Sequence, residues 1–122
     1  MDKKFIMTRN ADGTANVMYG NVKMPQPAVW HSPTGFEFGF GGSGPADLAL
    51  NILELTLRDM GYKGERQKLF KGSCFNLAAQ LHQAFKWLHI APIDRNLGGE
   101  LTLEFVKDWI EKAVADKELT HA

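Results

Sequence analysis

The feature that most constrains the fold is a segment that is apolar on almost every side. Between Pro45 and Asp59 the polar side chains fall on one narrow stripe, at spacings of four, three and four residues: Asp47, Asn51, Glu54 and Arg58. This spacing predicts a helix, because residues three or four apart share a helix face. A helix with so little polar surface has to be covered on most sides. We therefore expect it at the centre of the molecule, with Gly61 at its C-terminal cap.

The residues before this helix predict strands, and those after it predict helices. Strands are expected over residues 5–8 and 16–19, joined by an Asp12-Gly13 turn that favours a tight hairpin. A further strand is expected over residues 36–40, where Phe36, Phe38 and Phe40 alternate and would share one face.

Two more helices are expected, over about residues 73–88 and 102–119, each with an apolar face. Strands followed by helices predict an α+β fold. We expect one domain over residues 1–122, in which a small antiparallel sheet from the N-terminal third packs against about three helices.

Composition excludes several classes of protein. Lys plus Arg and Asp plus Glu both number 14, and a net charge of zero argues against non-specific nucleic-acid binding. The single cysteine, Cys74, allows no intrachain disulfide and no Cys/His zinc pattern, and we expect it to be a small buried apolar residue. No apolar run follows Met1 to Lys4 or is long enough to span a membrane, which predicts a cytoplasmic protein without membrane contact.

The most informative segment is the glycine-rich junction between the predicted strand and the central helix. It reads Phe-Gly-Gly-Ser-Gly-Pro-Ala-Asp over residues 40–47. The first turn of a helix leaves backbone N–H groups unpaired, and the helix dipole adds about half a positive charge there. Glycines would let an anion approach these groups closely. Pro45 suits the first helical position, with Ser43 or Gly44 as N-cap.

Two interpretations of this junction remain open. Gly41, Gly42, Ser43 and Gly44 could bind an anionic or polar ligand, although the segment has neither the P-loop pattern nor the dinucleotide-binding pattern. Alternatively, they form only a tight turn, in which Asp47 supplies the acidic residue of the first helical turn and so disfavours a second anion.

Cationic and aromatic residues elsewhere could complete such a site. Residues 63–71 contain four cations and one anion, and Arg66 or Lys68 would reach a bound phosphate if the segment folds back. The alternative is a solvated connector. Trp30, which is next to His31, could stack on a base, anchor the core or lie in a dimer interface.

No catalytic residue, metal ligand or cofactor is predicted. His82 and His89 are seven residues apart, whereas metal ligands on one helix favour spacings of three or four, so we expect both to be surface residues. Ser43 lacks the flanking residues of a nucleophile elbow.

Residues 31–50, which read HSPTGFEFGFGGSGPADLAL, resemble the core motif of an uncharacterised family, a domain of unknown function common in phages and other mobile elements. The family pattern continues to a Phe-Lys-Trp element, here Phe85-Lys86-Trp87, so the resemblance covers about residues 31–88. The family often has Trp and Tyr where this chain has Phe38 and Phe40. It has no agreed activity, so no catalytic residues can be carried over.

These observations lead to one main hypothesis and two alternatives. The main hypothesis is a non-enzymatic, homo-oligomeric protein that binds a nucleotide-like or phosphorylated small molecule at the glycine-rich turn. Its expected ligand-binding residues are Phe40, Gly41, Gly42, Ser43, Gly44, Trp30, His31, Arg66 and Lys68. The phage context implied by the resemblance suggests sequestration of a cyclic nucleotide defence signal in a bacterial host. The alternatives are a protein-interaction module that inhibits a host enzyme and a small hydrolase.

Overall fold

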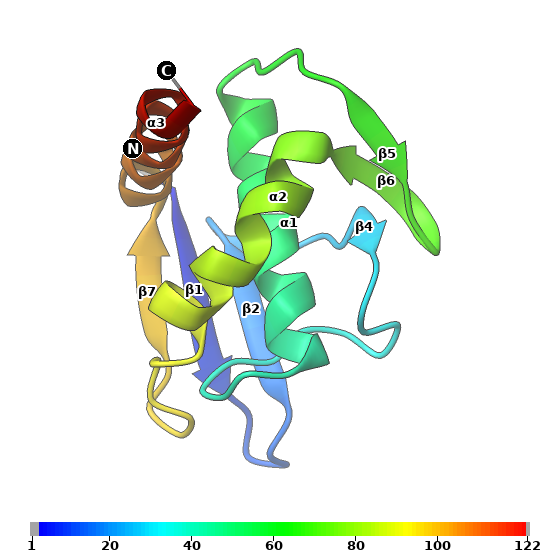
Figure 1. Cartoon of the computed structure of the whole chain (residues 1–122). Helices are drawn as coiled ribbons and strands as arrows, with labels where there is room; N and C mark the ends of the chain where they lie inside the picture. Colours follow the sequence, from blue (N-terminus) through cyan, green and yellow to red (C-terminus); the bar gives the residue numbers. More distant parts are fainter. Residues whose placement is uncertain (1–2, 122) are drawn as a thin grey trace.

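In residues 3–121, whose backbone the computed structural model describes, the chain forms two antiparallel sheets and three α-helices. Figure 1 shows their arrangement. The side chains are described for residues 3–116. The larger sheet has the order β3-β2-β1-β7, made of β1 (Lys4–Arg9), β2 (Ala15–Tyr19), β3 (Val22–Lys23) and β7 (Gly99–Thr102). The smaller sheet has the order β4-β6-β5, made of β4 (Ala28–Val29), β5 (Arg66–Lys68) and β6 (Lys71–Phe75). The helices are α1 (Ser43–Asp59), α2 (Asn76–Phe85), which continues into a π-helical turn η1 (Lys86–Ile90), and α3 (Leu103–His121). The predicted α+β class is confirmed.

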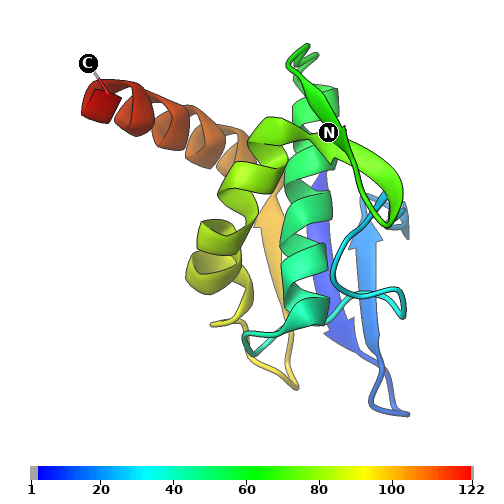
Figure 2. The same cartoon turned by 45° about the vertical axis from the view of Figure 1, so that its right-hand side comes forward.

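The central position predicted for α1 is also confirmed. Thirteen of its 17 residues are buried. Figures 1 and 2 show α1 lying over one face of the larger sheet, roughly along the direction of β1 and β2, with α2 beside it. Leu50, Leu53 and Leu57 belong to the same buried cluster as Phe5 and Met7 of β1. Burial of each such side chain contributes about 1.5–3 kcal/mol to folding.

The spacing of the polar stripe on α1 suggested a face that is turned towards water. Most of this stripe is instead buried. Asp47, Asn51 and Glu54 are fully buried, and we call these three residues the polar seam. The carboxylate of Asp47 accepts hydrogen bonds from the backbone N–H groups of residues 30, 31 and 32, at 3.2, 2.9 and 2.9 Å. A charge can be buried in this way because three donors replace its water.

The other two members of the seam bind the smaller sheet. The side chain of Asn51 accepts a hydrogen bond from Ala28 N–H (3.0 Å) and donates one to Ala28 O (2.8 Å) in β4. Glu54 accepts a hydrogen bond from Phe75 N–H at the end of β6 (2.8 Å) and forms ion pairs with Arg66 of β5 (3.0 Å) and Arg58 (2.8 Å). The smaller sheet is thus attached to α1 through polar contacts.

Several sequence-based expectations after α1 are wrong. Residues 63–71 are not a simple connector, because β5 and the start of β6 lie within them. The second helix begins at Asn76 and not at Ser73, since Glu54 holds the end of β6 in extended conformation. Strand β7 was not expected; it pairs with β1, which brings the C-terminal half of the chain into the N-terminal sheet. Gly61 follows the C-cap residue Met60, close to the predicted position.

Residues 36–40 do not form the expected strand. Gly35 and Gly39 have positive φ angles of 118° and 85°, which interrupt an extended chain. The three phenylalanines therefore do not share a face: Phe38 is fully buried, whereas Phe40 is 37% exposed.

Two further sequence-based points concern membranes and Cys74. Among the helices within residues 3–121, none is both long and apolar enough to cross a membrane. Cys74 is buried as expected, and this burial is the main cause that raises the pKa of its thiol to about 11.

The polar seam leads to a stability prediction. Replacing Asn51 with Ala leaves the buried N–H and C=O groups of Ala28 without partners, and each loss costs about 1–3 kcal/mol. We expect N51A to lower the free energy of unfolding in urea by about 2–5 kcal/mol. Gln83→Ala on the exposed face of α2 is the control and should change it by less than about 0.5 kcal/mol. Equal effects of the two variants would contradict the role of the seam.

Candidate ligand-binding site

The N-terminus of α1 has backbone donors without acceptors. Gly42 is the N-cap, with an extended φ of −148°, and no side chain caps the helix. Ala46 N–H donates to Gly42 O (3.0 Å). No group among residues 3–121 accepts a hydrogen bond from the N–H of Ser43 or Gly44, and Pro45 has no N–H. The helix begins two residues earlier than predicted, so Pro45 is its third residue and Asp47 lies beyond the first turn.

The glycines around this N-terminus lie in close contact with side chains of the protein itself. A Cβ atom on Gly44 would lie 2.8 Å from Cβ of Glu37, and one on Gly42 would lie 2.9 Å from the ring of Phe40. A Cβ atom on Gly41 would collide with the ring of Trp87. These contacts favour the interpretation of the junction as a tight turn, but they leave the N–H groups of Ser43 and Gly44 unpaired.

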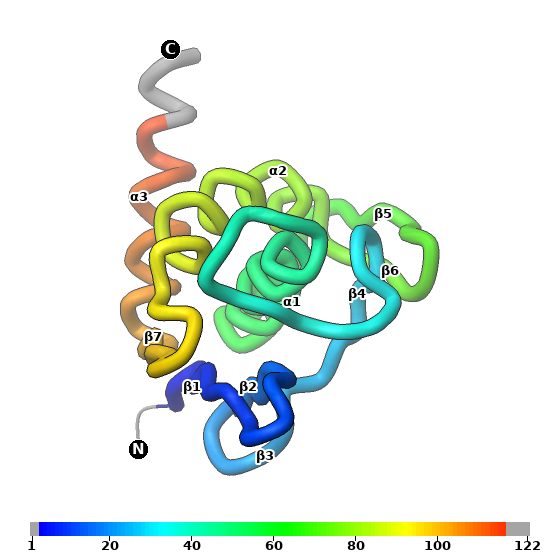
Figure 3. The backbone as a smooth tube through the Cα atoms, turned by 90° about the horizontal axis from the view of Figure 1, so that it is seen from below, coloured from blue at the N-terminus to red at the C-terminus, as the bar shows by residue number. Residues whose placement is uncertain are grey.

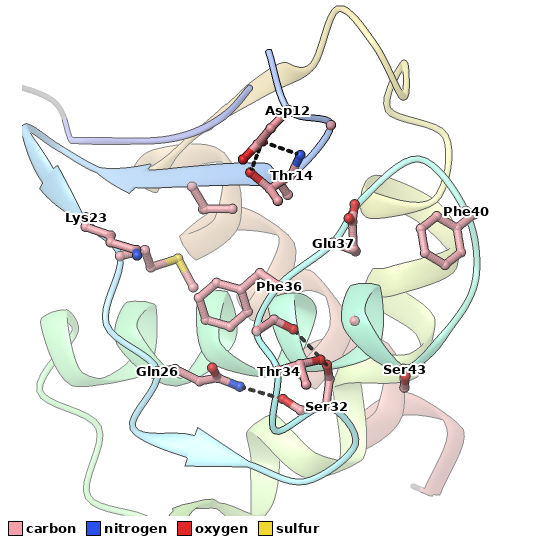
Figure 4. Close-up of a pocket in the computed structure, with 16 residues that line it drawn as sticks. Asp12, Thr14, Lys23, Gln26, Ser32, Thr34, Phe36, Glu37, Phe40 and Ser43 are labelled. Atoms are coloured by element: carbon pink, nitrogen blue, oxygen red, sulfur yellow. Dashed lines mark hydrogen bonds between the residues drawn. The ribbon is translucent and has the colours of Figure 1, made fainter. Parts of the chain in front are cut away.

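A cavity of about 680 Å³ lies against the first turn of α1, as Figure 4 shows. Ser43 and Gly44 line it together with the loop of residues 32–37 and the turn between β1 and β2. Such a volume is typical of small-molecule sites, which measure about 300–1,000 Å³. Its polar lining includes Gln26, Thr34 and Lys23, and Phe40 also lies in its wall.

The two carboxylates in the cavity wall already have local partners. Asp12 accepts hydrogen bonds from N–H and Oγ1 of Thr14 (3.0 and 2.6 Å), which lower the pKa of its carboxyl. Glu37 forms a two-oxygen ion pair with Nη1 of Arg9 (2.8 and 3.0 Å). Arg9 lies over the ring of Phe38 and also donates to Arg95 O (2.9 Å). Arg9 therefore balances the charge of Glu37 beside the helix N-terminus.

Different cations lie near the turn from those expected. Arg66 is held by Glu54, by Oγ of Ser73 (3.0 Å) and by the ring of Phe75, and Lys68 follows it in β5. Figure 1 shows β5 beside the C-terminal half of α1, away from its N-terminus. The expectation that Arg66 and Lys68 reach the glycine-rich turn is therefore wrong.

The cations beside the turn come from η1 and the loop after it. The guanidinium of Arg95 lies 5.1 Å from the ring centre of Phe40, and Nζ of Lys86 lies 4.3 Å from that of Trp87. Sequence reasoning did not assign these residues to the site, although Lys86 and Trp87 belong to the Phe-Lys-Trp element. Their proximity to Gly41 follows only from the packing of η1 against α1.

Trp30 and His31 form a separate cluster with His82. Trp30 is 40% exposed and stacks on His31 at 4.7 Å, and neither residue lines the cavity. Nε2 of His31 lies 3.0 Å from Nε2 of His82, whose Nδ1 lies 2.6 Å from Ala79 O. A neutral His82 then donates from Nδ1 and accepts from His31. The expectation of a surface His82 is wrong, since it is only 2% exposed.

Within the residues whose side chains the structure describes, no group of three or more His, Cys, Asp or Glu side chains is placed to hold a metal ion.

The chain belongs to a family of unknown function, DUF6166, whose sequence model matches residues 7–76. The match covers more than half of the chain and includes the glycine-rich turn and all of α1. The Phe-Lys-Trp element lies beyond the matched residues. No curated protein and no solved structure matches the chain.

The buried His82 leads to a pH prediction. Burial is the main cause that lowers the pKa of His82 below its ordinary value of 6.5. The unfolded chain therefore binds more protons below about pH 6.5, and the free energy of unfolding falls as the pH drops through this range. We expect this fall, measured by urea titrations between pH 7 and 5, to be smaller in H82Q. Because burial also lowers the pKa of His89, some pH dependence remains. An unchanged slope in H82Q would contradict the assignment of a depressed pKa to His82.

The packing at Gly44 predicts that a Gly to Ala change in this helix destabilises the protein. A Gly to Ala change in a helix usually stabilises a protein by about 0.4–1 kcal/mol. At Gly44 the added methyl group would overlap Glu37, and overpacking costs about 1–3 kcal/mol. We expect G44A to lower the thermal midpoint, whereas S43A, at an exposed neighbouring position, leaves it nearly unchanged. A stabilised G44A would mean that Glu37 does not pack on α1.

Proposed function

We propose that this protein is a non-enzymatic binding protein for a nucleotide-like or phosphorylated small molecule, which it holds at the N-terminus of α1. The observation that carries the proposal is the unpaired N–H groups of Ser43 and Gly44, on residues that also line a cavity of about 680 Å³. Donors of this kind, at the positive end of the helix dipole, are suited to phosphoryl oxygens.

The surroundings suit the remainder of such a ligand. Gln26 and Thr34 offer an amide and a hydroxyl group that can bind the polar edge of a base or a sugar. The exposed ring of Phe40, in the same wall, offers a stacking surface. The phosphoryl group would then lie against α1, and the organic part of the ligand inside the cavity.

Binding is favoured over catalysis because three carboxylates and one histidine, the candidates for acid–base chemistry in this half of the molecule, already have structural partners. Asp47 and Glu54 hold backbone N–H groups, Glu37 is paired with Arg9, and His82 is bonded to His31. In the phage context that the sequence resemblance implies, retention of an intact ligand would sequester a signal such as a cyclic nucleotide.

A second candidate function rests on exposed apolar side chains. Trp87 and Leu88 in η1 are 58% and 59% exposed. Large side chains of this kind are enriched at protein interfaces. They would suit a module that inhibits another protein, or contact between copies of this chain in a homo-oligomer, and light scattering measures the latter directly.

A ligand panel tests the proposal against its alternatives. The purified protein is incubated with mononucleotides, dinucleotides and cyclic dinucleotides, its thermal midpoint is measured, and the ligand recovered after denaturation is identified by mass spectrometry. A raised midpoint with intact ligand supports the proposal. Chemically altered ligand would contradict it in favour of a hydrolase, and no shift with any member would favour the protein-interaction module.

Two substitutions at one position test the role of the backbone donor. Proline is well tolerated at the first position of a helix, and the extended conformation of Gly42 suits the residue before it. S43P therefore removes one unpaired N–H while the helix can still begin there. Loss of a hydrogen bond to a charged group costs about 1.5–3 kcal/mol, so we expect S43P to weaken nucleotide binding about tenfold or more in calorimetry. S43A keeps the N–H group and should bind as the wild type does; equal affinities of S43P and wild type would place the ligand elsewhere.

A further inference from the structure

Two lysines of the hairpin formed by β5 and β6 have no acidic partner. Lys68 and Lys71 are exposed, and among the described side chains no carboxylate forms an ion pair with either of them. Arg66, at the other end of β5, is instead paired with the buried Glu54. The nearest acidic residue in the sequence, Glu65, precedes β5 and so lies at the end of the hairpin that is away from its turn. The turn end of the hairpin therefore carries uncompensated positive charge.

The same turn exposes an aromatic ring. Phe70 lies between β5 and β6, where Leu69 N–H donates a hydrogen bond to Gly72 O (3.1 Å), and its side chain is 80% exposed. We call residues 68–72, which include the Phe70 ring and both lysines, the hairpin tip. A ring left in water forgoes about 1.5–3 kcal/mol that its burial would contribute. Aromatic side chains are enriched in the buried centres of protein interfaces.

A cavity of about 570 Å³ lies beside the hairpin tip. Its lining combines apolar side chains with one ammonium group and one amide, from Pro27, Val29, Pro33, Phe70, Lys71 and Gln26. No carboxylate is among its lining residues. Of these residues, only Gln26 also lines the cavity at the N-terminus of α1, so the two cavities are separate places on the molecule. The cavity beside the hairpin tip suits an apolar group that is accompanied by negative charge.

The hairpin is fixed firmly to the rest of the molecule. Gly72 has a positive φ of 79°, and a Cβ atom there would collide with Pro27 O, because β6 approaches the start of β4 closely. At the other end, Glu54 binds both Arg66 and the N–H of Phe75. Figures 1 and 3 show the hairpin at the edge of the molecule, on the side of α1 opposite to α3. A surface that is rigid before binding loses less conformational entropy when a partner binds.

We propose that the hairpin tip binds an acidic linear segment of a partner protein, with an apolar side chain of that segment in the cavity beside Phe70. The Phe70 ring and the walls of Val29 and Pro33 then cover the apolar side chain, and Lys68 and Lys71 pair with neighbouring carboxylates. This surface is separate from the small-ligand site at α1, so the inference does not depend on the proposed function.

The observations favour an acidic peptide over other anionic partners. Small-molecule sites enclose about 70–90% of their ligand, whereas Phe70 stands 80% exposed at the edge of an open surface. Nucleic-acid binding needs an excess of cations, and this chain has 14 Lys plus Arg against 14 Asp plus Glu. Stable anchoring to a membrane surface needs a larger apolar face than the single ring of Phe70.

The test starts from a display library of short random linear peptides, because the selected peptides reveal the chemistry of the occupant directly. The library is selected on the full chain and, in parallel, on F70A, which should keep the thermal midpoint of the wild type because the ring is exposed. We expect peptides with several acidic residues beside an aromatic or aliphatic residue to be enriched on the wild type alone. An oligothymidylate and vesicles that contain phosphatidylserine are offered to both proteins in separate assays.

The affinity of one synthesised peptide from the enriched set is then measured by fluorescence polarisation. We expect F70A to weaken binding about tenfold or more, since the buried aromatic contact is lost. The double variant K68Q/K71Q should weaken it about threefold or more, because exposed ion pairs contribute less. The matched controls are L97A, which removes another highly exposed apolar side chain, and K63Q, which removes a lysine outside the hairpin tip. Both should bind the peptide as the wild type does.

Each outcome decides the inference. Enriched acidic peptides that bind F70A and the double lysine variant more weakly support it. It is overturned if the wild type enriches no peptides over F70A, if the enriched peptides lack acidic residues, or if F70A binds them with unchanged affinity. Binding of the oligothymidylate or the vesicles that is lost in F70A, without peptide enrichment, overturns it and assigns the hairpin tip to nucleic acid or lipid. The nucleotide panel tests the cavity at α1 separately, and F70A should respond to it as the wild type does.

Discussion

The structure depends on the polar seam, a row of three buried polar side chains along one face of α1. Without its partners, each of Asp47, Asn51 and Glu54 would be a costly group in an apolar interior. Together they bind the loop after β4, β4 itself, and the hairpin of β5 and β6. The apolar faces of α1 attach it to the larger sheet, whereas the polar face orders the smaller one. One helix therefore organises both parts of the molecule.

The attachment of α1 to the larger sheet by its apolar faces and to the smaller sheet by its polar face also explains the position of the candidate site. The loop of residues 32–37 forms part of the cavity wall, and Asp47 fixes the N–H of Ser32 at the start of that loop. Arg9 and Glu37 fix its other end against the larger sheet and α1. The cavity is thus built from a loop that is anchored at both ends beside the unpaired N–H groups of a rigid helix.

The sequence predicted α1, its burial, the first hairpin and the α+β class, because these follow from local periodicity and turn residues. It did not predict the burial of the polar stripe, since the spacing of Asp47, Asn51 and Glu54 is the same on a solvated face as on one whose partners are backbone groups. Strand β7 and the hairpin of β5 and β6 are short and gain their stability from distant partners. For the site, the glycine-rich turn was recognisable, but its flanking cations were not, because Lys86 and Arg95 approach it only through tertiary packing.

The π-helical turn η1 has one consequence for how chains of this architecture can diverge. Its Ala91 N–H donates to Lys86 O (2.8 Å), five residues back, so this turn accommodates one residue more than an α-helical turn of the same height. Deleting that extra residue would restore α-helical winding and rotate the residues on one side of the deletion by about 100° around the helix axis relative to those on the other side. The contact between the Trp87 ring and Gly41 depends on this winding. We therefore expect a single-codon deletion in this turn to disturb that contact while the sheets and their attachment to α1 stay intact.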